Sequence, residues 1–288
     1  MADVAAKQGS YALAARGRER AAVMAYERAH RLGPGRVDYV IFLTGALAAL
    51  AESEEQPAAR DDLFGAAEQL LGDARDRRPL DVQPVLNLGR LQARWAALTE
   101  DREARRGRID RALHNFEKAR RLTPNRPVLL NAHGSAWAMA GRPEEARRLF
   151  EQSLSLDDKY PDTYLLLARS HVELGDGNGA LAVLERGANE LARSATLQRS
   201  LANAYRALGR DEDAAAAYGR ALELAPDERT SRIAGIARAL ETEDCGQAVA
   251  ALQAFEDRYP GDPELPLLRG RIVETCVGRT VTSTGSAP

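Results

Sequence analysis

The sequence has few cysteines and few lysines. Its two cysteines, Cys245 and Cys276, are too few for a disulfide framework, and their spacing matches no zinc site. We favour two unpaired thiols, with a single bridge between them as the alternative. Lysine occurs only at positions 7, 118 and 159, so arginine supplies nearly all the basic charge. Its planar guanidinium groups suit carboxylates.

Long apolar runs are also absent. The longest, VIFLTGALAALA at 40–51, is shorter than the roughly 20 residues that a membrane span needs. No basic stretch leads into an apolar segment with a small-residue cleavage site, so we see no secretory signal and expect a cytoplasmic protein. The formal net charge of −2 creates no overall field that favours nucleic acid. We therefore expect a protein or peptide partner, no nucleic acid and no membrane span.

Signatures of catalysis are missing as well. The chain has no GxxxxGK[ST], HExxH or GxSxG motif, and we expect no enzyme activity, no metal and no cofactor. The glycines of GDGNG at 175–179 fit a turn between helices better than a phosphate-binding loop, which needs a preceding strand. His133 and His171 fall at packing positions without a carboxylate at triad or ligand spacing, so we interpret them as structural.

What the sequence does contain is a repeat. The phrase FEKARRLTPNR at 116–126 returns as YERAHRLGPGR at 26–36, FEQSLSLDDKY at 150–160 and YGRALELAPDE at 218–228. Phe116 and Phe150 are 34 residues apart, and Tyr218 follows Phe150 after twice that interval. A fixed period of this length indicates a stack of similar supersecondary units.

The unit at 195–228 shows the pattern most clearly. Its apolar residues recur at three- and four-residue steps, which predicts two amphipathic helices. Gly209 should close the first helix, and Pro226 should end the second. Small residues recur where helices must approach closely, at Gly134 and Ala202 in first helices and at Ala146, Ala180, Ala214 and Ala248 in second helices. No sustained alternation of apolar and polar residues predicts a strand.

Large, Leu, small and aromatic residues in the first helix, then Ala, aromatic, Ala and Pro in the second, resemble the tetratricopeptide repeat. The resemblance implies an all-α fold, a right-handed superhelical solenoid of antiparallel helix pairs. We expect one solenoid over 1–279 and a disordered tail at 280–288. Its repeats lie near 3–36, 37–81, 82–126, 127–160, 161–194, 195–228 and 229–262, with a capping helix at 263–279. The second and third repeats each carry 11 extra residues, which predicts two extended hairpins.

The same resemblance assigns certain first-helix positions to the concave groove. They predict a ligand-binding set of Asn87, Arg90, Asn131, Arg169, Arg199, Asn203 and Arg206. Arg199 and Asn203 match part of the clamp with which some family members hold a peptide carboxylate, but Ala234 replaces a further Asn of that clamp. The arginines suit an anionic segment. The competing possibilities are solvated polar residues without a ligand, and neutralisation by Asp162, Glu173 and Glu241.

Our leading interpretation is a non-enzymatic scaffold that binds a protein or peptide through its groove. Residues 88–141 also resemble the repeat region of bacterial O-antigen ligase and polymerase-like proteins, an alternative that implies an extracytoplasmic accessory domain in glycan assembly. A regulator that lacks its DNA-binding or catalytic module is a weaker third hypothesis. The pattern predicts no oligomeric state.

Overall fold

The computed structural model describes residues 1–15, 17–225, 229–242 and 244–277. These residues form fifteen α-helices and one π-helical turn, and no strand occurs among them. The chain divides into two compact units, the first from Met1 to Asp157 and the second from Asp158 onward. The architecture is the all-α solenoid of helix pairs that the 34-residue period predicts. That one solenoid domain continues over 1–279 stays a prediction.

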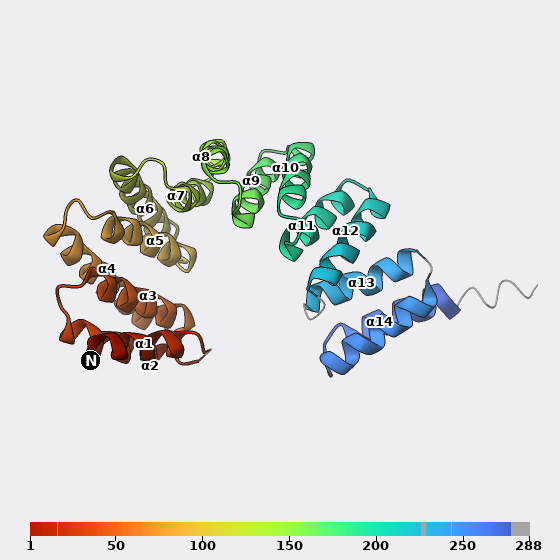
Figure 1. Cartoon of the computed structure of the whole chain (residues 1–288), viewed down its shortest axis with the longest axis horizontal. Coiled ribbons are helices and arrows are strands. Elements are labelled where there is room, and N and C mark those ends of the chain that lie inside the picture. The colour runs from red at the N-terminus through yellow and green to blue at the C-terminus, as the bar shows by residue number, and fades with distance from the viewer. Residues whose placement is uncertain (16, 226–228, 243, 278–288) are drawn as a thin grey trace, which may run out of the picture. The chain divides into compact units, whose positions relative to one another are not determined.

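Four helix pairs make the first unit, and neighbouring pairs stack on one another (Figure 1). In chain order the helices are α1 (Ala2–Leu13), α2 (Glu19–Leu32), α3 (Val37–Ser53), α4 (Pro57–Arg77), α5 (Val82–Ala97), α6 (Arg102–Leu122), α7 (Pro127–Met139) and α8 (Pro143–Leu156). α4 and α6 are the long members, with 21 residues each, whereas α8 has 14.

The second unit contains three helix pairs and a terminal helix. Its elements are α9 (Pro161–Glu173), α10 (Gly177–Glu190), α11 (Ala195–Ala207), α12 (Asp211–Leu224), α13 (Arg229–Glu241), α14 (Cys245–Arg258), α15 (Leu265–Ile272) and the π-helical turn η1 (Val273–Val277). The predicted stop at Pro226 and the predicted tail at 280–288 lie outside the described residues.

The turn inside several pairs depends on a glycine. Gly141, Gly175 and Gly209 have φ angles of 73°, 77° and 72°. This is a left-handed backbone conformation that residues with a Cβ atom rarely adopt. Each lies just after a first helix, at the same place in its repeat. The second helix then begins two residues later, so a glycine at this point sets the antiparallel pairing.

Small residues set the distance between paired helices. A Cβ added at Gly134 on α7 would come within 2.6 Å of the Phe150 ring on α8, so only glycine fits without movement. Ala146, Ala180, Ala214 and Ala248 have exposed fractions of 0%, 2%, 2% and 0%. The small residues of the repeat are therefore its close-packing positions, as the sequence pattern indicates.

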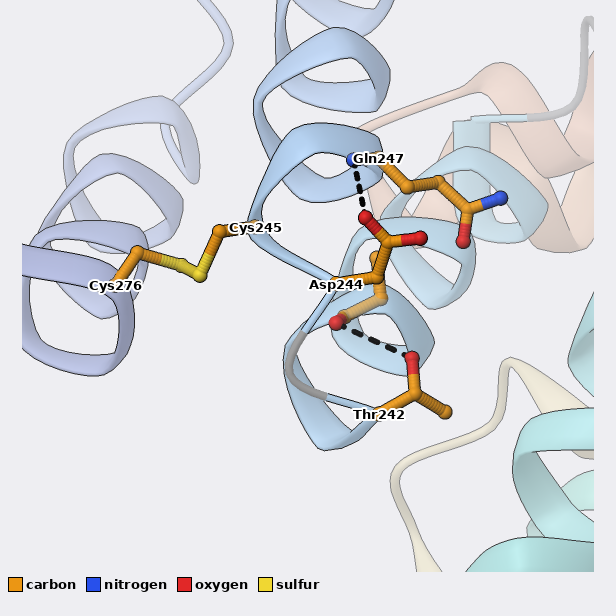
Figure 2. Close-up of a disulfide and its surroundings, with 6 residues drawn as sticks. Thr242, Asp244, Cys245, Gln247 and Cys276 are labelled. Carbon is orange, nitrogen blue, oxygen red and sulfur yellow. Dashed lines mark hydrogen bonds between the residues drawn. A yellow bond between two sulfur atoms is a disulfide. The ribbon is translucent and has the colours of Figure 1, made fainter.

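The two cysteines form a disulfide, which corrects our preference for unpaired thiols. Cys245 begins α14, and Cys276 lies in η1, 31 residues later. Figure 2 shows the bridge between these two elements, beside Asp244, which caps α14 by accepting a hydrogen bond from the backbone N–H of Gln247. α14 and α15 pack together and bring the two Cα atoms to 5.7 Å, a distance a disulfide can span. Sequence spacing alone could not show this approach.

Candidate binding groove

First helices of successive repeats contact one another in each unit. The contacting pairs are α1 with α3, α3 with α5 and α5 with α7 in the first unit, and α9 with α11 in the second. The side chains that point away from the second helices therefore line one face in each unit. Every residue of the predicted groove set lies on one of these first helices: Asn87 and Arg90 on α5, Asn131 on α7, Arg169 on α9, and Arg199, Asn203 and Arg206 on α11.

In the first unit, the predicted residues are half-buried. The Asn87 amide nitrogen donates to the backbone oxygen of Gln83 at 2.8 Å, one turn earlier on α5. Burial, and secondarily the positive charge of Arg126, lower the pKa of Arg90 below its ordinary value. Asn131 is half-buried on α7. The positive charges of Arg90 and Arg126 repel each other, and a bound anion would reduce this repulsion.

In the second unit, Asn203 and Arg206 contact Tyr218, an aromatic residue of the repeat pattern. The Tyr218 hydroxyl, from α12, donates to the Asn203 side-chain oxygen at 2.5 Å. The Arg206 guanidinium carbon lies 6.0 Å from the centre of the same ring. Tyr218, on the second helix of the same pair, thus contacts two residues of the predicted groove set. A tyrosine at a repeat's aromatic position, where Phe116 and Phe150 carry no hydroxyl, is the sequence signal for this role.

Acidic side chains partly offset the arginines. The Arg169 Nε atom lies 3.0 Å from the Glu173 carboxylate, one turn later on α9, although the Arg169 side chain remains 77% exposed. On α13, burial and then Asp211 raise the pKa of Glu241, whereas Arg271 and Arg206 act in the opposite direction. Neutralisation therefore applies to Arg169. The charge of Arg206 affects the pKa of Glu241, but these two side chains form no ion pair within the part of the chain described.

The histidines differ from each other. His133 is buried between the rings of Phe116 and Trp137, and burial lowers its pKa to about 4. His171 does have a carboxylate partner, contrary to our sequence interpretation: its Nδ1 lies 2.9 Å from Asp176 Oδ2. The spacing of five residues crosses the α9–α10 turn, so helical periodicity does not predict it. Asp176 also caps α10 by accepting from the backbone N–H of Gly179.

No cluster of His, Cys, Asp and Glu in the described part of the chain could hold a metal ion. Across the same residues, no helix has the length and apolar character needed to cross a membrane. The GDGNG segment spans the α9–α10 turn and the first residues of α10, with Gly175 at positive φ, and no strand precedes it within the described chain. The first-helix face remains the best candidate for binding.

Antiparallel helix pairs, a small residue at each crossing and a face lined by first helices define a helical-repeat protein, a class of interaction scaffolds. Tetratricopeptide repeat models match residues 101–162, 138–199 and 195–228. The chain therefore contains tetratricopeptide repeats over residues 101–228. Proteins with this fold act as protein–protein interaction scaffolds, and their partners are proteins or peptides.

Solved structures show the same fold. A thermophilic tetratricopeptide protein of Thermus thermophilus has a TM-score of 0.58 and 23% identity, over 71% of this chain and 98% of that one. PilF of Pseudomonas aeruginosa has a TM-score of 0.54 and 15% identity, over 79% and 96%. A repeat protein of Parabacteroides merdae has values of 0.51 and 14%, over 94% and 98%. At these identities the likeness concerns the fold alone. No curated protein sequence matches the chain.

Proposed function

We propose that this chain is a non-enzymatic scaffold that binds a protein or peptide through its first-helix face, and that the bound segment is anionic. The observation that carries the proposal is the α11 face of the second unit. Arg199, Asn203 and Arg206 lie on successive turns of that helix, and Tyr218 holds Asn203 in place. Guanidinium groups on a helix can bind carboxylates with two parallel hydrogen bonds, which are stronger than neutral ones.

Charge reversal tests this proposal. The double variant Arg199→Glu/Arg206→Glu should keep the parent's circular dichroism spectrum and lose partners that the parent captures from its source lysate. A matched control is Arg186→Glu/Arg193→Glu, which changes the charge equally at two exposed positions in the same unit. The binding of a captured partner's acidic segment, measured by direct titration, should weaken as the salt concentration rises. If the groove variant captures the same partners as well as the parent at low salt, this face is not the site.

The second candidate function is an extracytoplasmic accessory domain in a bacterial glycan-assembly system. The Cys245–Cys276 disulfide favours it, because disulfides persist mainly in oxidising compartments. A cytoplasmic location stays a prediction, and we infer that the bridge argues for the other side of the membrane. Thiol labelling of the chain in its own cells tests the location, since a cytoplasmic chain would label at both cysteines. Titration with a lipid-linked glycan tests the function, and binding that survives Arg199→Glu/Arg206→Glu would support it over the peptide scaffold.

A further inference from the structure

The first unit has an arginine-rich pocket on its extended α5–α6 hairpin, away from the residues predicted for the groove. Its volume is about 570 Å³. The first half of α6, the end of α7 and the turn after it line this pocket: Arg102, Arg105, Arg106, Ile109, Asp110, Leu113, Trp137, Met139, Ala140, Gly141 and Arg142. We call it the hairpin pocket.

The unequal lengths of two helices create the hairpin pocket. α6 has 21 residues and α7 has 13, so at 1.5 Å per residue α6 is longer by about 12 Å. Arg102, Arg105 or Arg106, Ile109 and Leu113 recur every three or four residues and therefore share one side of α6. Ile109 and Leu113 on that side line the pocket together with the end of α7, whereas the three arginines lie nearer the start of α6. The 11 inserted residues of the third repeat thus supply the basic part of the pocket.

The charges of the hairpin pocket are largely unbalanced. Arg102, Arg105 and Arg106 are exposed, and none of them has an ion-pair partner among the residues described. Arg142 pairs with Glu145 and lies 5.7 Å from the centre of the Trp137 ring. Asp110 is the one carboxylate among the lining residues. The pocket consequently offers three free guanidinium groups on two turns of one helix.

The floor of the hairpin pocket is apolar. Ile109 is buried, and Leu113, Trp137 and Met139 are half-buried around it. Such a floor gains free energy when an aliphatic or aromatic side chain covers it, at roughly 25 cal/mol for each Å² removed from water. A bare phosphate or a sugar phosphate has no apolar group to place there. An acidic peptide with one large apolar residue matches both the floor and the arginines.

We propose that the hairpin pocket is a second peptide-binding site, which takes an acidic segment of a partner protein with one large apolar side chain. The apolar side chain lies against Trp137 and Met139, and the flanking carboxylates bind Arg102, Arg105 and Arg106. This site is separate from the proposed groove on α11, and neither depends on the other. It would let the scaffold hold two segments, which raises avidity if both can be engaged together.

The test uses the full chain and a fluorescein-labelled peptide of glutamates around one Phe. Fluorescence anisotropy measures binding at low salt. Arg105→Glu/Arg106→Glu should weaken binding about tenfold or more, because charge-assisted bonds become repulsions. The matched control, Arg28→Glu/Arg31→Glu, makes the same charge change at exposed α2 positions and should bind as the parent does. Trp137 emission should shift on binding, since it lines the pocket, whereas the other tryptophan, Trp95, is buried.

Three comparisons define the ligand and separate the two sites. A peptide with serine in place of Phe should bind clearly more weakly, and inositol hexakisphosphate should not displace the parent peptide efficiently. The groove variant Arg199→Glu/Arg206→Glu should bind the peptide normally. The proposal is overturned if the α2 control loses as much peptide affinity as the α6 variant. It is also overturned if the α6 variant binds as well as the parent, or if the parent does not bind the peptide. Equal binding of the serine peptide would assign the arginines to a general polyanion site and overturn it too.

Discussion

The Arg108 guanidinium carbon lies 4.0 Å from the centre of the Trp95 ring. Both side chains also meet Asp61 from α4: Trp95 Nε1 donates to its carboxylate at 2.5 Å, and Arg108 Nη2 is 3.6 Å from the same oxygen. Phe64 stacks on Trp95 at 5.4 Å between ring centres. One cluster therefore connects α4, α5 and α6.

Removing the Arg108 guanidinium should destabilise the first unit. Arg108→Met keeps the apolar stem but loses the cation–π contact and leaves Asp61 without this partner, at a cost of about 1–2 kcal/mol. Urea denaturation measures the change in the free energy of unfolding. Arg106→Met, on an exposed side of the same helix, is the control and should stay within about 0.5 kcal/mol of the parent. Equal effects of the two variants would show that the cluster contributes no stability.

Glycine substitutions should have opposite effects at two helical positions. Gly134→Ala places a Cβ 2.6 Å from the Phe150 ring and should cost about 1–3 kcal/mol through overpacking. Gly72→Ala meets nothing within 4 Å and should stabilise α4 by about 0.5–1 kcal/mol, because alanine favours a helix more than glycine does. Thermal melts followed by circular dichroism measure whether Gly134→Ala lowers stability and Gly72→Ala raises it.

Hydrogen exchange extends that test to the coupling between repeats. In the Gly134→Ala variant, lost protection should centre on α7 and α8 and extend to α6, the preceding neighbour, because each repeat contacts only the next. The loss should fade toward α1. Uniform loss from α1 to α8 would contradict nearest-neighbour coupling.

The buried His133 should make stability depend on pH. Burial lowers the pKa of His133 to about 4, whereas an unfolded histidine has a pKa of 6.5. As pH falls from 6.5 toward 4, the unfolded chain binds a proton that the folded chain does not, so the free energy of unfolding decreases. The decrease amounts to about 3 kcal/mol at most, and this contribution is absent above pH 6.5.

His133→Leu isolates this effect from that of the carboxylates. The Nδ1 atom of His133 makes no hydrogen bond in the described structure, so leucine breaks none at that atom. The variant should lose less stability than the parent between pH 7.5 and pH 4.5, as measured by urea denaturation at both values. Parallel pH profiles for the two proteins would mean that His133 is protonated in the folded state.

Breaking the disulfide should loosen the C-terminal elements without affecting the first unit. The Cys245–Cys276 bridge closes a long segment that includes α14 and α15, and such a closure contributes roughly 2–4 kcal/mol. Cys245→Ser/Cys276→Ser, or a reductant, should increase hydrogen exchange in α15 and leave α3–α6 unchanged. A thiol titration of the unfolded parent without reductant should detect no free thiol, and two free thiols would contradict the bridge.

Much of the helix pairing follows from residue types at fixed intervals. Glycine at the end of a first helix, alanine at each crossing and an aromatic residue one turn later predict helix, turn and close approach from local chemistry alone. The arginines and asparagines of the groove set can be placed on first helices in the same way. Their partners cannot, because Tyr218 reaches Asn203 across a hairpin and Glu241 approaches Arg206 from the following repeat.

The sequence by itself determined the all-α class and the 34-residue period, since these depend on helical periodicity and on residues near one another in the chain. Only the tertiary structure decided that Cys245 meets Cys276, that His171 has Asp176 beside it, and that Arg108 covers Trp95. Such contacts depend on where whole helices end and which side chains their packing brings within a few ångströms. A period specifies that helices stack, whereas distances between particular atoms arise only when the stack has formed.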